Sequence, residues 1–280
     1  MIAEIFAKNK FMIILTYILL AIEEGMMSAV PYCLGLAVDS LLENQYHCFW
    51  YYVGICSVSL LISVGRRLWD TRMYSHIWAK AADEKISHLI EQNIERSKVV
   101  SRFGLLIDYT RFFEYAVPAG IAAIIDIIIS IIILFLFNPT ATIILIVILK
   151  LTIIVQYMGA KITSNLHQDL QVTTEKNNAD IISSERPNLS EALAKQSNLL
   201  ISISDTEATI YGLHETLAII AEIVMLLVSI NTGATAGTIL ANLTYVFRIF
   251  MKLSQIGNTI AHYKIVRGYE DFFYLKSGQD

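Results

Sequence analysis

The sequence predicts an all-α membrane protein with six transmembrane helices, and three observations lead to this fold class. The chain of 280 residues is 55% hydrophobic and only 16% charged, whereas soluble domains of this size carry about a quarter charged residues. The charges are missing from long stretches and ordinary in number between them, which is the pattern of membrane spans separated by soluble segments. Between these stretches, finally, Lys and Arg occur in every second connecting segment along the chain and are absent from the connecting segments in between.

Six apolar segments reach the roughly 17–25 residues that a helix needs to cross a bilayer. The first is long and contains Pro31, and the fifth and sixth are the least apolar. With the extensions described below, the predicted helices cover about residues 11–42, 49–96, 114–137, 140–178, 197–230 and 236–273.

The connections alternate between short and long. Short ones lie near residues 43–48, 138–140 and 231–234, and each of the other two, at about 66–114 and 159–214, is about fifty residues long. Every Lys and Arg in a connection or tail lies in a long connection or near a chain end. The excess of cytoplasmic Lys and Arg in membrane proteins therefore predicts that both termini and both long connections are cytoplasmic. An even number of crossings also requires the two termini to lie on the same side of the membrane.

The long connections are predicted to continue the helices out of the membrane. Residues 66–95 contain few helix breakers, and apolar residues recur there at helical spacing with charges between them. At about 1.5 Å per residue, such a helix extends tens of ångströms into the cytoplasm. Gly104 and Pro187 mark turns at the two far tips. Residues 1–280 are thus expected to form a single transmembrane domain.

Three short motifs in order carry a family resemblance. Residues 29–42 contain a proline, then a glycine, then an aspartate close to the helix end; residues 236–245 match the opening of a sixth helix, and residues 263–270 match a stretch that leads into a nucleotide-binding domain. On this topology, the sequence resembles the transmembrane domain of type IV, exporter-type ABC transporters over essentially its whole length.

The resemblance implies a domain-swapped homodimer in which helices four and five reach into the partner and enclose a central cavity. It also implies coupling helices that dock on an ATPase, at tips that contain Ser97, Lys98, Arg102, Arg186 and Glu191. The sequence departs from the family where the nucleotide-binding domain would begin, since it has no G-x-x-x-x-G-K-[ST] loop to hold phosphates. We therefore expect no ATP hydrolysis by this chain and no catalytic residue in it.

Five ionisable residues lie inside the predicted spans: Glu23, Glu24, Asp126, Lys150 and Glu222. A charge at mid-bilayer costs about 2.5–3.5 kcal/mol, so each should have a partner or face a wet cavity. Asp126, Lys150 and Glu222 all fall roughly 13–18 Å from the outer helix ends at about 1.5 Å per residue. We expect Lys150 to pair with Asp126 or Glu222, either as a static ion pair or as part of a substrate or proton site.

Glu23 and Glu24 are adjacent and point about 100° apart on a helix, so both cannot face the same neighbour. One of them is expected to face a cavity or a crevice that opens to the cytoplasm. Arg248 and Lys252 are expected nearer the inner face, where long cationic side chains reach the interface.

Two features near the outer ends of the helices have simpler expectations. Asp39 is interpreted as a solvated helix end. Gly233-x-x-x-Gly237 fits either helix packing in a membrane or turn chemistry.

Several function classes find no support. The net charge of −4 leaves no dense basic face for nucleic acid. The six histidines and three cysteines show no metal-binding spacing, and no nucleophile–base pair stands out. No metal, cofactor or enzyme active site is therefore predicted.

The sequence favours a transporter subunit that moves a solute by alternating access, driven by a separate ATPase subunit or by an ion gradient. Its expected partners are membrane lipid, a second copy of the chain and that ATPase subunit. The absence of eukaryotic targeting signals favours a bacterial inner membrane. The alternative is a non-transporting scaffold or regulatory subunit that retains the fold. A polar cavity lined by the intramembrane carboxylates would favour transport, whereas fully paired charges without a cavity would favour the scaffold.

Overall fold

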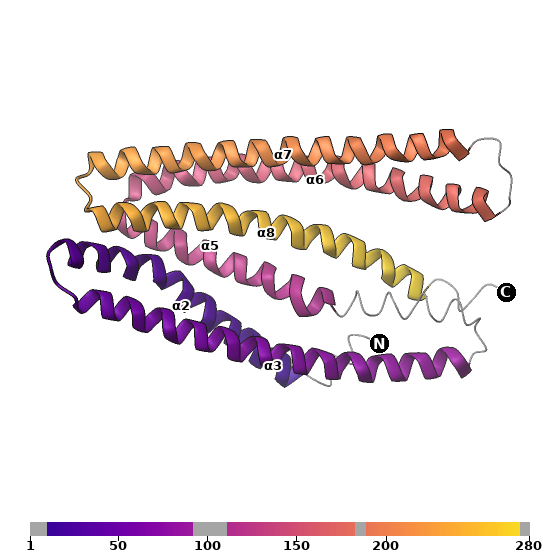
Figure 1. The fold of residues 1–280 in the computed structure, drawn as a ribbon, viewed down its shortest axis with the longest axis horizontal. Helices are drawn as coiled ribbons and strands as arrows, with labels where there is room; N and C mark the ends of the chain where they lie inside the picture. The colour runs from indigo at the N-terminus through magenta and orange to yellow at the C-terminus, as the bar shows by residue number, and fades with distance from the viewer. Residues whose placement is uncertain (1–9, 92–110, 183–188, 275–280) are drawn as a thin grey trace. The chain divides into compact units, whose positions relative to one another are not determined.

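The computed structural model describes residues 10–91, 111–182 and 189–274, which are almost entirely helical (Figure 1). Within these residues there are six α-helices and one π-helical turn. In chain order they are α2 (Lys10–Leu42), α3 (His47–Glu91), η1 (Phe112–Ala116), α5 (Val117–Phe137), α6 (Pro139–Ile182), α7 (Leu189–Asn231) and α8 (Ala236–Tyr274). α7 begins about eight residues earlier than the sequence predicts, because its first turns are polar and carry no apolar span signal.

Five helical segments of the described chain are long and apolar enough to cross a membrane: Lys10–Leu42, His47–Lys80, Phe112–Phe137, Pro139–Thr174 and Ser190–Asn231. α8 is not among them, so the described chain has five such spans where the sequence predicts six. The reason lies in Asn242, Arg248 and Lys252, which lower the hydropathy of its first five turns. Asn242 is buried inside the bundle, and the two cations have ion-pair partners there. The polarity of α8 thus serves helix contacts.

The described chain divides into two compact units. The first holds residues Met1–Pro139 and Leu226–Asp280, and therefore α2, α3, η1, α5, α8 and the end of α7. The second holds Thr140–Met225, which is α6 and most of α7. In both units large apolar side chains cover the outside of the apolar segments, for example Leu61, Leu136 and Val147. A surface of this kind is suited to lipid.

In the first unit α2 and α8 are in backbone contact near their shared end. A Cβ atom on Gly35 would lie 2.6 Å from the Gly237 carbonyl oxygen, and one on Gly237 would overlap the Gly35 carbonyl. Only glycine at both positions allows this approach. Gly233 has a φ of +71° in the turn before α8, a conformation that favours glycine. In the Gly233-x-x-x-Gly237 motif, Gly237 therefore serves helix packing and Gly233 serves the turn.

Asp39 holds the start of α8, which corrects its interpretation as a solvated helix end. Its Oδ1 accepts a hydrogen bond of 2.8 Å from the Gly237 N–H, and its Oδ2 accepts one from the Thr235 hydroxyl. The first N–H groups of a helix have no partner within it. Asp39 supplies one from a neighbouring helix, at the end where the helix dipole favours a negative charge.

The substitution Asp39→Ala is expected to lower the stability of the solubilised protein by about 1 kcal/mol, because it removes a cap from α8. Thermal unfolding in mild detergent measures this. Glu43→Ala, at an exposed position a few residues later, is the matched control and should unfold at the temperature of the unchanged protein. Equal unfolding temperatures for both variants would contradict the capping role.

In the second unit α6 and α7 run side by side. The Gln156 side chain is hydrogen-bonded to Nδ1 of the buried His214 at 2.9 Å, and Gly159 lies directly against Ile210. Thr152 and Met225 are almost fully buried. The unit is thus a helical hairpin with its own small interior.

Candidate functional site

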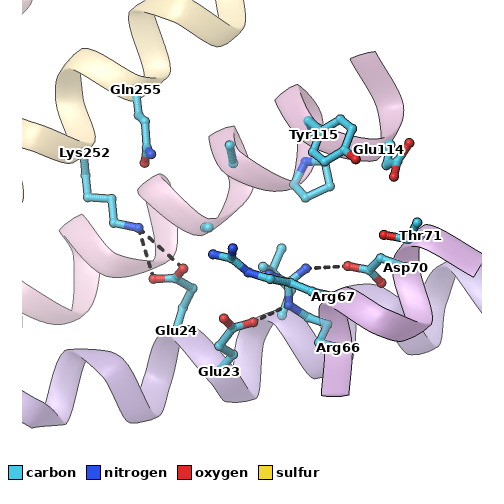
Figure 2. Close-up of a pocket in the computed structure, with 14 residues that line it drawn as sticks. Glu23, Glu24, Arg66, Arg67, Asp70, Thr71, Glu114, Tyr115, Lys252 and Gln255 are labelled. Carbon is cyan, nitrogen blue, oxygen red and sulfur yellow. Dashed lines mark hydrogen bonds and ion pairs between the residues drawn. The ribbon is translucent and has the colours of Figure 1, made fainter. Parts of the chain in front are cut away.

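Glu23 and Glu24 bind two different helices, as their 100° separation predicts. Glu23 forms an ion pair with Arg66 of α3, and Arg66 also binds Asp70 one turn later at 2.5 Å. Glu24 forms an ion pair of 3.3 Å with Lys252 of α8. Adjacent residues of α2 therefore tie it to α3 and α8 at the same level (Figure 2).

These ion pairs border a polar pocket of about 490 Å³ within the first unit (Figure 2). Side chains from α2, α3, η1, α5 and α8 all contribute to it. Its lining residues are Leu20, Glu23, Glu24, Arg66, Arg67, Asp70, Thr71, Glu114, Tyr115, Pro118, Ala119, Ala122, Lys252 and Gln255. Both members of the Glu23–Glu24 pair reach this pocket, whereas the sequence led us to expect one.

The position of the pocket follows from helix geometry. Arg67 lies about twenty residues after the start of α3, which is roughly 30 Å along the axis at about 1.5 Å per residue. The hydrocarbon core of a bilayer is about 30 Å thick. The pocket therefore lies near one end of the apolar part of the bundle, away from the turns at Glu43–Tyr46 and Thr232–Thr235.

Asp126 lies deeper and is fully buried, with a side-chain exposure of 0%. Its Oδ1 accepts a hydrogen bond of 2.7 Å from Arg248 of α8 and lies 2.6 Å from the Ser28 hydroxyl of α2. Its Oδ2 has no hydrogen-bond partner among the residues that the structure describes. Asp126 is thus the centre of a junction between α2, α5 and α8.

Within the first unit the cation beside Asp126 is Arg248, and the expectation that Lys150 pairs with Asp126 or Glu222 stays a prediction. In the second unit Lys150 is exposed and Glu222 is half-exposed, and the described residues form no ion pair between them.

Comparison with known proteins decides the family. Residues 2–237 match the family described as the ABC transporter transmembrane region. The chain belongs to that family. It is therefore the membrane component of a transporter, and no ATPase domain is found in this chain. A comparison with curated proteins finds no match.

The sequence did not predict Arg248 as the partner of Asp126 in this ABC transmembrane region and placed it nearer the inner face. A usable signal was present. Arg248 is about a dozen residues from the start of α8, and Asp126 is about a dozen residues from the end of α5. These two helix ends lie on the same side of the bundle, so equal distances from them place Arg248 and Asp126 at the same depth. The depth estimate from the sequence covered Asp126, Lys150 and Glu222 and did not include Arg248.

Most of the coupling-helix candidates of this ABC transmembrane region lie outside the described residues. These are Ser97, Lys98, Arg102 and Arg186. Glu191 is described, and it is exposed in the first turn of α7. Its role stays a prediction.

No metal site emerges from the described part of this ABC transmembrane region. No group of three or more His, Cys, Asp or Glu residues lies close enough together there to hold an ion. Cys33, Cys48 and Cys56 are all free thiols.

Proposed function

We propose that this chain pairs with a second copy and with a separate nucleotide-binding subunit, and that the complex moves a solute across the membrane by alternating access. Family membership supports a role in transport. Residues 1–280 contain no phosphate-binding P-loop, so the proposal assigns ATP binding to a nucleotide-binding domain outside these residues.

The polar pocket is the observation that carries the choice between transport and scaffolding. It is lined by Glu23 and Glu24 and by charged residues of three other elements. A bundle that only anchors a partner gains nothing from a hollow of charged side chains, which is costly inside a membrane. Asp126 and Arg248 have a structural role in this proposal, because their ion pair fixes the packing of α5 against α8.

The proposed topology has six crossings, with both termini and the pocket end in the cytoplasm of a bacterial cell. The alternation of Lys and Arg among the connections supports this orientation. α8 is included as a crossing because it packs along α2 and α5 and because Asn242, Arg248 and Lys252 each bind a partner inside the first unit. The long continuations of α3, α6 and α7 are then cytoplasmic.

The proposed dimer exchanges the α6–α7 hairpin between the two copies. The separation of Thr140–Met225 as a compact unit supports such an exchange. In such a dimer the exchanged hairpin that carries Lys150 and Glu222 packs against the other copy. If an ion gradient drives the transporter instead, Glu222 and Glu24 are the carboxylates that would carry the ion.

Purification from the native membrane in mild detergent tests the proposal. We expect a soluble subunit with a P-loop to be recovered in equal amount, and Lys98→Glu to reduce its recovery at least fivefold, because a reversed charge at a docking tip repels the partner. Lys80→Glu, earlier in the same connection, is the matched control and should retain the subunit. Recovery of the chain alone as a dimer would contradict ATP-driven transport and make Glu222→Gln the next variant to assay for gradient-driven uptake.

A further inference from the structure

Buried polar atoms without a partner mark a second site in the first unit, at the junction of α2, α5 and α8. We infer that this junction binds a water molecule between Asp126, Arg248 and Ser130. The inference concerns the interior of one chain, so it does not depend on the partner subunit or on how transport is powered.

Three buried polar atoms of the junction have no hydrogen-bond partner among the residues that the structure describes. They are Oδ2 of Asp126, Nε of Arg248 and Oγ of Ser130. Asp126 and Ser130 are both 0% exposed. A buried polar group without a partner costs about 1–3 kcal/mol, and more when it is charged. Ordered water normally binds such groups, and a buried water makes about three hydrogen bonds.

The ion pair between Asp126 and Arg248 is only half closed. Nη2 of Arg248 donates to Oδ1 of Asp126 at 2.7 Å, and the Nε–H group lies on the same edge of the guanidinium as Nη2. Such an edge normally places its two donors on the two oxygens of one carboxylate. Here Nε and Oδ2 are the atoms that stay unbound among the described residues. A water molecule that accepts from Nε–H and donates to Oδ2 completes the pair.

Ser130 supplies the third partner of this water. It follows Asp126 by four residues on α5, and side chains at this spacing are neighbours on one face, with Cβ atoms about 5–6 Å apart. A serine hydroxyl accepts hydrogen bonds as well as donating one. The water therefore accepts one hydrogen bond, from Arg248, and donates two, to Asp126 and Ser130.

The junction is adjacent to the polar pocket on all three helices. On each helix a residue that lines the pocket lies four positions from a residue of the junction. The pairs are Glu24 and Ser28, Ala122 and Asp126, and Lys252 and Arg248. Four residues correspond to about 6 Å at about 1.5 Å per residue. The polar interior that begins at the pocket thus continues by a helical turn toward the middle of the bundle.

The charge of the junction favours water over an ion. Arg248 neutralises Asp126, so a bound cation or anion would leave a net charge in a buried place. The ligand also has to accept from a guanidinium and donate to a carboxylate, and water does both. One bound water leaves the carboxylate far short of full hydration, so the cation stays necessary.

Tyr245 can report on this water. Its residue is 0% exposed, and its hydroxyl donates to the Ser28 carbonyl at 2.7 Å. The hydroxyl of the same serine lies 2.6 Å from Oδ1 of Asp126. Pulsed X-ray radiolysis converts water into hydroxyl radicals, and radicals from a bound water oxidise the side chains around it. We expect mass spectrometry of the detergent-solubilised protein to find Tyr245 oxidised, although bulk solvent does not reach it.

Two variants remove the groups that hold the water. The double substitution Asp126→Leu with Arg248→Leu should lower the oxidation rate of Tyr245 about tenfold, because hydrogen bonds to two charged groups are lost. Ser130→Ala removes one neutral hydrogen bond and should lower the rate about twofold. Lys161→Leu, at an exposed position on α6, is the control and should leave the rate unchanged.

Tyr74 of α3 is also 0% exposed, and its oxidation rate should be the same in every variant that keeps the fold. If the double variant loses its fold by this measure, Ser130→Ala decides, because it keeps the ion pair. An oxidation rate of Tyr245 that is equal in the unchanged protein and in every folded variant would overturn the inference, since the ion pair would then be dry.

Discussion

The substitution Arg248→Leu is expected to destabilise the detergent-solubilised protein by about 3–5 kcal/mol, the cost of leaving one member of a buried ion pair alone. Asp126 is fully buried and Arg248 lies 2.7 Å from it, so the carboxylate would lose its cation without gaining water. Thermal unfolding, or the fraction of monodisperse protein on a sizing column, measures the loss.

A second variant separates charge from packing. The double substitution Asp126→Leu with Arg248→Leu removes both charges and is expected to recover most of the stability, because a buried pair contributes little over apolar side chains. Lys161→Leu, at an exposed cation further along α6, is the control and should leave the unfolding temperature within the error of the measurement. A double variant as unstable as Arg248→Leu would show that the guanidinium matters for its shape and not for its charge.

The substitution Gly237→Ala is expected to cost about 1–3 kcal/mol or more, the range of overpacking substitutions. The new methyl group would overlap the backbone carbonyl of Gly35, and no change of side-chain rotamer can relieve contact with backbone. α8 would have to move away from α2, and the hydrogen bonds that Gly237 and Thr235 donate to Asp39 would be lost with the contact.

Gly25→Ala in α2 is the matched control, because a Cβ there would meet no atom within 4 Å. It should keep or slightly raise the unfolding temperature, since alanine is the better helix former by about 1 kcal/mol. If the two alanine variants unfold at the same temperature, the close contact of α2 and α8 is not important for stability.

Family membership and the order of the helices could be predicted because they depend on local features. Apolar runs of sufficient length and the placement of Lys and Arg are visible in the sequence itself. The motif of Pro31, Gly35 and Asp39 and the opening of α8 were recognised as family features. Their physical reason appeared only when Gly35 and Asp39 were found against Gly237 and Thr235.

The candidate site was predicted only in part. Glu23 and Glu24 were selected because charge inside an apolar run is costly wherever the helix packs. Arg66, Arg67 and Asp70 were not predicted as site residues because they follow the apolar run, where charged residues are ordinary. The same reasoning overlooked Glu114, which lies at the start of the next span.

The sequence by itself determined that the chain is a helical membrane protein, since hydropathy and helix period are properties of consecutive residues. The ABC transporter type followed from the resemblance of three short motifs in order. The tertiary structure decided which charge meets which. Asp126 could be paired with any cation at a similar depth, and helix packing in the first unit places Arg248 beside it. Partner choice depends on the rotation and neighbours of each helix, which one-dimensional spacing does not contain.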